Sequence, residues 1–171
     1  MEIQKLYNAN VYLDGTKSLV GSAKEITLPE ISATTEEHSA LGMIGKVDLP
    51  TGLEKLTLSF KWSGFYKDVV KATMNPFAEH KLQIRGNVQV FGAGAVPKSM
   101  PVIVEVTGSF LKSGMGTLVA MTGNEPSSEF NAHYLKITLG EEELVEIDIL
   151  NNIWIVGGTD VLAAYRANLG V

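Results

Sequence analysis

Apolar and polar residues alternate along two stretches of this chain, and this alternation constrains the fold more than any other feature. From Leu56 to Trp62 every second residue is apolar, and the residues between them are Thr, Ser and Lys. The stretch from Leu82 to Val90 repeats the pattern, with Gly86 in its apolar series. Because side chains of a β-strand point alternately to opposite faces, both stretches predict strands buried on one face and solvated on the other.

Further strands and two short helices complete the predicted fold, which is mainly β. The stretches 101–110 and 133–139 are interpreted as strands, and the sheet is expected to be antiparallel because the connections are too short for helical crossovers. One helix is expected near 65–74, capped by Ser63 and packed through Phe65 among others. A second helix is expected near 160–168. Thr159 should cap it and Gly170 should follow its end.

The segment 29–53 has no sustained periodicity of either kind, although it lies between two predicted strands. Long loops inside compact domains are uncommon and tend to be functional. Folded back as a hairpin, this segment would reach roughly 40 Å, whereas a domain of this size has a radius of gyration of about 15 Å. We therefore predict a single domain, 1–171, from which 29–53 protrudes as an arm.

Composition excludes several classes of protein. The net charge is −5, and Lys and Arg are scattered singly, which disfavours tight binding to nucleic acid,. The chain has no cysteine, so disulfides and thiolate zinc sites are excluded,. The opening MEIQKLYNAN predicts no secretory signal. No apolar run approaches the roughly 20 residues that a membrane span requires.

The most acidic stretch, GEEELVEID, raises the question of a catalytic carboxylate pair. After a hairpin turn, alternation puts Val145, Ile147 and Ile149 on one face and the acids Glu146 and Asp148 on the other. Paired carboxylates hydrolyse glycosides only where apolar surroundings raise the pKa of one of them, and calcium loops have an alternating Asp/Asn pattern that is absent here. The pair is therefore interpreted as an acidic edge that faces solvent or an interface.

No other motif indicates chemistry. His38, His80 and His133 are far apart along the chain, and none has a partner at ligand spacing,. The glycines of FGAGAVP (91–97) do not open a helix after a buried strand, so the segment is interpreted as a turn between strands. We expect no catalytic residue, no cofactor and no metal site.

Four segments follow one another in a familiar order. NANVYLDG lies near the start, EITLPEI and TEEHSALGMIGKVDLPTGLEKL follow, and the last is HYLKITLGEEELVEIDILNNIWIVGGTDVLAAYRANLGV. In these segments, which cover both ends and most of the chain, the protein resembles the major tail tube protein of contractile-tailed phages and of R-type bacteriocins. Residues 92–131 match this pattern only loosely.

The resemblance implies an antiparallel β-sandwich or barrel with two flanking helices, assembled into hexameric rings that stack into a hollow tube. The implied partners are further copies of the chain, a contractile sheath protein, a baseplate or tube-initiator protein and a tail terminator. DNA would pass through the lumen without specific binding. The protein would be a non-enzymatic part of the virion tail, assembled in the bacterial cytoplasm, with no membrane anchor. The alternatives are the tube of a type VI-like secretion system or a phage-derived bacteriocin and, more remotely, a carbohydrate-active β-sandwich protein.

The arm is where subunits are predicted to meet. The residues expected at this interface are Glu36, Glu37, His38, Leu41, Gly42, Met43, Ile44, Val47 and Leu49. Six subunits of net charge −5 would carry about −30 per ring, and a lumen of that sign would repel DNA phosphates,. Four cations on polar strand faces leave open whether those faces line the lumen, meet the sheath or pair with acids such as Glu146 and Asp148. They are Lys55, Lys61, Lys81 and Arg85.

Overall fold

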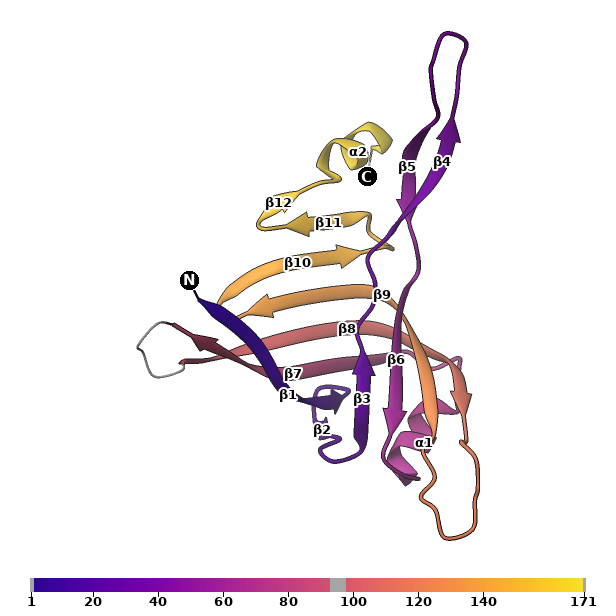
Figure 1. Cartoon of the computed structure of the whole chain (residues 1–171), viewed down its shortest axis with the longest axis vertical. Coiled ribbons are helices and arrows are strands. Elements are labelled where there is room, and N and C mark those ends of the chain that lie inside the picture. Colours follow the sequence, from indigo (N-terminus) through magenta and orange to yellow (C-terminus); the bar gives the residue numbers. More distant parts are fainter. Residues whose placement is uncertain (1, 93–97, 171) are drawn as a thin grey trace.

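Antiparallel strands make up most of the chain in the computed structural model, which describes residues 2–92 and 98–170 (Figure 1). The strands are β1 (Ile3–Leu13), β2 (Lys17–Ser18), β3 (Ala23–Thr27), β4 (Ala33–His38), β5 (Val47–Leu53), β6 (Leu56–Trp62), β7 (His80–Phe91), β8 (Lys98–Gly114), β9 (Ser127–Leu139), β10 (Glu142–Asp148), β11 (Ile153–Val156) and β12 (Thr159–Asp160). The helices are α1 (Lys67–Thr73) and α2 (Ala163–Leu169). The predicted class, mainly antiparallel β with two short helices, is confirmed. The turn predicted at FGAGAVP falls on 93–97, outside the described residues.

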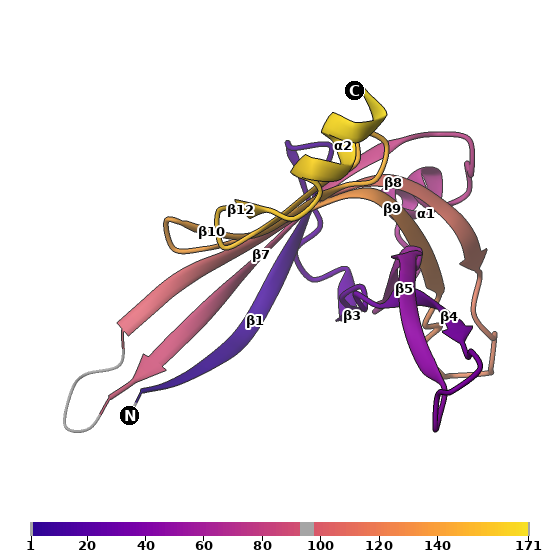
Figure 2. The same cartoon turned by 90° about the horizontal axis from the view of Figure 1, so that it is seen from above.

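The main sheet folds over itself because β9 belongs to both of its layers. The strand order is β12-β11-β10-β9-β8-β7-β1-β2, and β6 and β3 branch from β9. Residues 127–132 of β9 pair with β6, whereas residues 134–139 pair with β10. His133 between them is skipped in the register with β8. Such a bulge bends a strand, and β8 and β9 curve strongly in Figure 2, which carries β6 and β3 over one half of the sheet.

The core fills the space between the two layers. Phe60 from β6, Phe110 from β8 and Phe130 from β9 are at most 2% exposed, and the ring centroids of Phe110 and Phe130 lie 4.9 Å apart. Trp62 stacks on Phe60, and its indole N–H donates a hydrogen bond of 2.9 Å to the hydroxyl of Ser128. The buried polar atom of each partner is thereby satisfied. The predicted one-sided burial of β6 and β7 is confirmed.

The predicted start of the first helix was wrong. Ser63 does not cap α1, because its hydroxyl donates a hydrogen bond of 2.7 Å to the carbonyl oxygen of Gly21 in a distant loop. Tyr66 is the N-cap residue and makes no capping hydrogen bond through its side chain. Phe65, which was expected to pack, is exposed, while Val69 is buried against the core. The hydroxyl of Ser63 thus makes a long-range hydrogen bond in place of the helix cap that the local sequence pattern predicted.

The second helix also begins later than predicted. Thr159 is not its cap, because Thr159 and Asp160 form β12 in register with β11. The carboxylate of Asp160 instead accepts a hydrogen bond of 3.0 Å from the backbone N–H of Leu162 and pairs with Arg166. Gly170 ends the helix as predicted, with a φ of 75°, which glycine adopts without a steric penalty. No residue of α2 is buried.

A test of the fold lies at Gly108, where β8 crosses from one layer to the other. A Cβ atom at this position would lie 1.9 Å from the carbonyl oxygen of Asn131 and 2.8 Å from the Cα of Ala132, both backbone atoms of β9. We expect Gly108→Ala to lower the free energy of unfolding by about 3 kcal/mol, because the strand pair must separate to admit the methyl group. Urea unfolding followed by tryptophan fluorescence measures this change.

The matched control is Gly114→Ala on the same strand. A Cβ there would meet nothing closer than the side-chain oxygen of Ser127 at 3.5 Å. Gly114→Ala should change the free energy of unfolding by no more than about 1 kcal/mol in either direction. Equal stability of the two variants would contradict the register described for β8 and β9.

Candidate functional site

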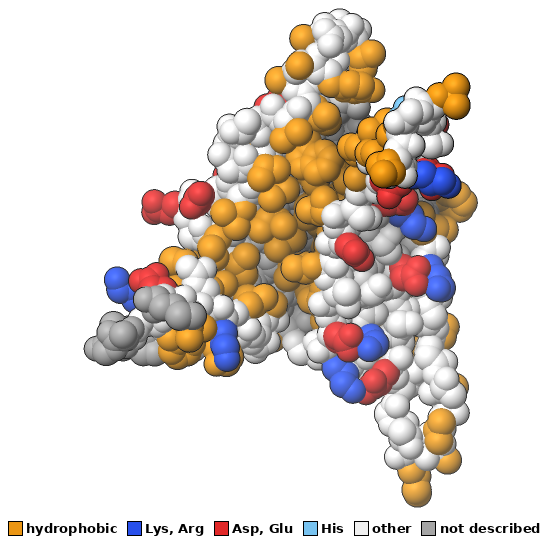
Figure 3. All heavy atoms as spheres, turned by 45° about the horizontal axis from the view of Figure 1, so that its top comes forward, with side chains coloured by type: hydrophobic (Ala, Val, Ile, Leu, Met, Phe, Trp, Pro, Cys, Tyr) orange, Lys and Arg blue, Asp and Glu red, His pale blue; other side chains and the backbone are white. Residues whose placement is uncertain are grey.

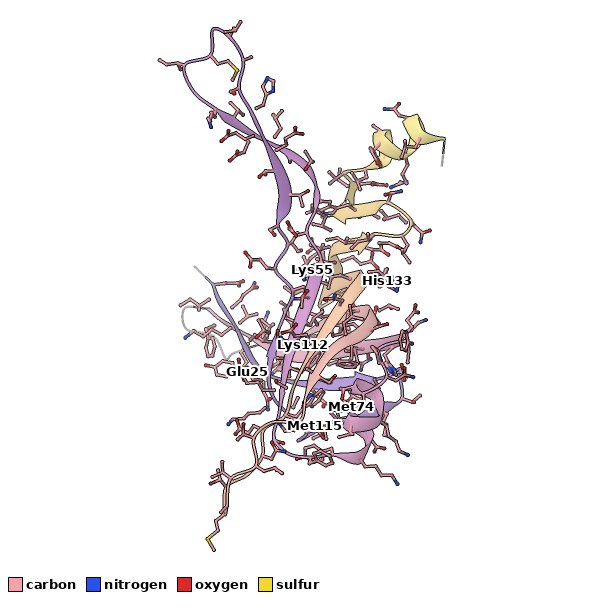
Figure 4. The ribbon with its side chains drawn as sticks, turned by 90° about the vertical axis from the view of Figure 1, so that its right-hand side faces the viewer. Glu25, Lys55, Met74, Lys112, Met115 and His133 are labelled. Atoms are coloured by element: carbon pink, nitrogen blue, oxygen red, sulfur yellow. The ribbon has the colours of Figure 1, made fainter. Side chains whose placement is uncertain are left out.

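The segment predicted as an arm forms a hairpin of its own. β4 and β5 pair only with each other, in a two-stranded sheet separate from the main one. Figures 1 and 4 show this hairpin standing clear of the body, with Lys55 near its base. The segment was predicted to protrude but its strands were not predicted, because it has no sustained periodicity. Nearly every residue of the hairpin is exposed, so neither face had to be apolar throughout and no alternation arose in the sequence.

The hairpin brings most of the predicted interface residues together but separates one. Glu36 is the register partner of Leu49, and His38 is the partner of Val47. Register partners point to the same face of an antiparallel pair, so these four residues share one face. Glu37 pairs with Asp48 on the opposite face, where it also binds Lys46 at 2.6 Å.

The tip of the hairpin is apolar and fully exposed. Leu41 and Ile44 have relative exposures of 106% and 110%, and Met43 beside them is also exposed. Gly42 has a φ of 89°, which provides the predicted bend,. Exposed side chains of this size at the end of a projecting ribbon bury nothing in their own chain. The hairpin therefore presents an unpartnered apolar tip, whose role as an interface stays a prediction.

The main sheet has a polar face on the side away from the core. The guanidinium of Arg85 lies 5.6 Å from the ring centroid of Tyr12 and donates a hydrogen bond of 2.8 Å to Gln83. Gln83 donates in turn to Glu105 at 2.8 Å. Lys136, in register with Glu105, completes a row of cations and anions across β7, β8 and β9. Charged groups alternate in sign on this face.

The four cations that the sequence left unassigned occupy two different surfaces. Alternation along β7 puts Lys81 on the polar face with Arg85. Lys61 lies on the other layer, where it binds Glu25 of β3 at 2.8 Å, and this contact raises the pKa of Lys61 through the hydrogen bond and charge of Glu25. Lys55 precedes β6 on that same layer. Neither Lys61 nor Arg85 pairs with the acids at 146 and 148.

The two acids of GEEELVEID that alternation put on one face, Glu146 and Asp148, have structural roles. Gly140, with a φ of 63°, forms the predicted turn between β9 and β10. Glu146 is half-buried and accepts a hydrogen bond of 3.0 Å from the hydroxyl of Tyr134. Asp148 accepts hydrogen bonds of 3.1 Å from two backbone N–H groups of the turn that follows β10. Alternation was predicted to continue to Ile149 on the face of Val145 and Ile147, but Ile149 lies beyond the end of β10 and is exposed.

Two histidine–carboxylate pairs lie at one end of the main sheet. His80 Nδ1 is 3.2 Å from Asp14 Oδ2, and His133 Nε2 is 3.3 Å from Glu79 Oε2. The register of β7, β8 and β9 brings these histidines near one another, which their separation in the sequence could not indicate. A pocket of about 600 Å³ beside them has Asp14, Glu79 and His133 among its lining residues but neither serine nor cysteine.

Nothing at this end forms a metal centre. Within residues 2–92 and 98–170, no group of three or more His, Cys, Asp or Glu side chains is arranged to hold a metal ion. In the same residues, no helix has the length and apolar character needed to cross a membrane. The described features that stand out are therefore surfaces: a projecting hairpin, a polar sheet face and the apolar face behind it.

Comparison with known proteins identifies the family. The family model described as "Phage tail tube protein FII" matches residues 3–170. The chain belongs to this family. The tail tube family consists of structural components of the virion tail, so the resemblance stated from the sequence is confirmed. The match includes the hairpin, the main sheet and both helices.

Individual relatives agree with this assignment. The chain is 32% identical over 174 residues to the "Tail tube protein" of Escherichia phage P2, covering 98% of each chain. It is 25% identical over 153 residues to the "Major tail tube protein" of Serratia phage KSP20, covering 88% of this chain and 86% of that one. Among solved structures, it is similar in fold to the sheath/tube terminator of an extracellular contractile injection system. The TM-score is 0.53 at 12% identity, over 77% of this chain and 94% of the other.

The contact between Tyr134 and Glu146 gives a test of the polar face. Burial, followed by the hydrogen bond to Glu146, raises the pKa of Tyr134 to about 12. Its phenol should therefore ionise later in the folded protein than in the unfolded chain, whose tyrosines ionise near pH 10. The stabilising contribution is complete below pH 10 and is lost as the pH rises through about 12,.

Absorbance at 295 nm, followed as the pH is raised, measures this ionisation. Tyr134→Phe should remove the component near pH 12, and Glu146→Gln should move it to lower pH because the acceptor charge is gone. Glu141→Gln, in the exposed turn, is the matched control and should leave it unchanged. If Glu146→Gln had no effect, the proposed role of this carboxylate would be wrong.

Proposed function

We propose that this protein is the repeating subunit of the inner tube of a contractile tail, forming hexameric rings that stack into a hollow conduit. The observation that carries the proposal is the β4–β5 hairpin, which projects with an exposed apolar tip in a chain that belongs to a tail tube family. Such a tip gains free energy only when another surface covers it. In a tube, the neighbouring subunit supplies that surface.

The edges of the main sheet support the same function. β1 from Ile3 onward pairs on one side with β7, and on its other side only Tyr12 and Leu13 pair with β2. Among the described residues, most of the outer edge of β1 thus has no strand partner. Exposed edges invite pairing with another strand, and a heterologous contact repeated around an axis closes into a ring. A ring that joins one subunit's β1 to the opposite edge of the next would leave no long edge exposed.

The polar face is the surface that we assign to the lumen. Its charges alternate in sign and engage one another, as in the row of Arg85, Gln83 and Glu105. DNA binding requires clustered cations that neutralise phosphates. A balanced face lets DNA pass without holding it. This differs from the strongly negative lumen suggested by the net charge, because many of the acids lie elsewhere.

The remaining partners follow from this role. A tube of this kind takes a contractile sheath on its outer surface, a baseplate or tube initiator at one end and a tail terminator at the other. No catalysis is required of the subunit, and the conspicuous acids Glu146 and Asp148 hold structural hydrogen bonds. We therefore propose that the protein is not an enzyme.

Deleting residues 36–47 and joining the ends with a short Gly-Ser linker tests the role of the hairpin. The core contains no residue of this segment, so the free energy of unfolding should change by less than about 1 kcal/mol. The variant should stay folded and fail to form sedimenting tubes. Circular dichroism and analytical ultracentrifugation measure the two properties.

The control for this deletion is Glu37→Gln. This substitution breaks the ion pair between Glu37 and Lys46 and leaves the apolar tip of the hairpin intact. An exposed ion pair contributes little, so this variant should assemble as the parent does. Normal assembly of the deletion variant, or its failure to fold, would refute the role given to the hairpin.

A further inference from the structure

The apolar face of the main sheet extends beyond the core. Leu6, Val102, Leu139, Val145 and Val156 lie on this side, and we call this set the open apolar face. Val102 pairs with Leu139, and Val145 pairs with Val156. A Cβ on Gly86, the register partner of Val102, would lie 2.6 Å from Leu6 Cδ1 and 2.9 Å from Val102 Cγ1. Partners across antiparallel strands point to the same face, so the set is continuous across five strands.

The chain's own second layer leaves most of this set uncovered, although Val145 also packs against the core. β3 and β6 lie over the half of the sheet near α1, and Figure 2 shows the other half of β1, β7 and β8 extending away from them. Leu6 is 55% exposed, Val156 is exposed, and the other three are only half-buried. Figure 3 shows a contiguous hydrophobic area between the main sheet and the second layer.

The exposure of the open apolar face cannot be explained by assigning it as the solvent-facing side of the sheet. An antiparallel sheet commonly packs one face and solvates the other. Here the solvated face is already occupied by Arg85, Glu105 and Lys136. The open apolar face is therefore the packing side of the sheet, left without its second layer. A large contiguous apolar surface on a soluble chain marks an interaction site.

We propose that the open apolar face is the docking site for the β4–β5 hairpin of a second copy of this chain. The hairpin has the matching character: Val47 and Leu49 lie on one face, and Leu41 and Ile44 stand at the tip. The tip, together with the face that Val47 and Leu49 share with Glu36 and His38, replaces the missing layer, as one sheet packs on another. This inference rests on the proposed self-assembly and names the surface that receives the hairpin.

A second copy is the occupant because each chain has both halves of the contact. β4 and β5 form no hydrogen-bonded pairing with another described strand, and the hairpin stands clear of the body in Figures 1 and 4. Each copy then offers one hairpin and receives one. This is a heterologous contact, which generates rings or filaments rather than closed dimers. The same contact covers the open apolar face and the apolar tip of the hairpin.

Cysteine cross-linking tests the contact directly, because the native chain has no cysteine. The test variant combines Ile44→Cys at the hairpin tip with Val102→Cys at the centre of the open apolar face, treated with a short bismaleimide. We expect a ladder of covalent oligomers on denaturing gels. The matched control replaces Val102→Cys by Ile103→Cys, the next residue, which points to the polar face. It should yield no ladder.

A charge substitution tests the energetics. Leu6→Lys places an ammonium on the open apolar face. It should raise the protein concentration needed for assembly about tenfold or more, because the variant loses one buried leucine contact. The matched control is Tyr7→Lys, because Tyr7 lies next to Leu6 on the polar face and has a similar exposure of 48%. It should change the protein concentration needed for assembly by less than about threefold. Thermal unfolding of both variants in dilute solution should match the parent.

The outcomes separate this inference from the proposed function. If parent tubes form but the test variant gives no ladder and Leu6→Lys assembles normally, the docking site is wrong and the tube function stands. An intramolecular cross-link would show that the hairpin folds onto its own sheet, which also overturns the inference. If the parent never assembles under any condition, the proposed function fails as well.

Discussion

The partial covering of one apolar sheet face is the constraint from which the other features of this protein follow. The strands β1, β7, β8, β9 and β10 have an apolar and a polar face along most of their length, but β3 and β6 cover only part of the apolar face. The bulge at His133 curves the sheet and creates the covered half, where the aromatic core forms. The uncovered half is stable in water only at the cost of exposed hydrocarbon, so the fold itself favours association.

Association of this kind accounts for the unusual distribution of residues between core and surface. A hairpin whose tip buries nothing in its own chain would be a liability in a monomer, because an isolated two-stranded ribbon is marginally stable in water. In the assembly that we propose, it becomes the missing cover of a neighbour. The acids that looked catalytic have a simpler explanation: Glu146 holds Tyr134, and Asp148 shapes a turn. Membership of a tail tube family agrees with a chain whose functional features are surfaces rather than a reactive site.

The sequence predicted those elements whose burial differs between their faces. β6 and β7 were found by alternation because Leu58 and Leu82 face the core and their neighbours face water. β4 and β5 were missed as strands because both of their faces are exposed, which removes the periodic signal. The cap at Ser63 failed because Gly21, far away in the sequence, accepts its hydrogen bond. The histidine–carboxylate pairs depend on strand register, which no local pattern encodes. The arm itself was anticipated from its length, while its role as an interface stays a prediction.

Electron microscopy of the purified protein, alone and mixed with its sheath protein, tests the central claim most directly. The account predicts rings with six-fold symmetry and a central channel, or tubes built from stacked rings of that kind. In averaged images, the hairpin density of each subunit should reach the sheet of a neighbour. Particles that remain monomeric at high concentration and in the presence of the sheath protein, or assemblies with no channel, would contradict it.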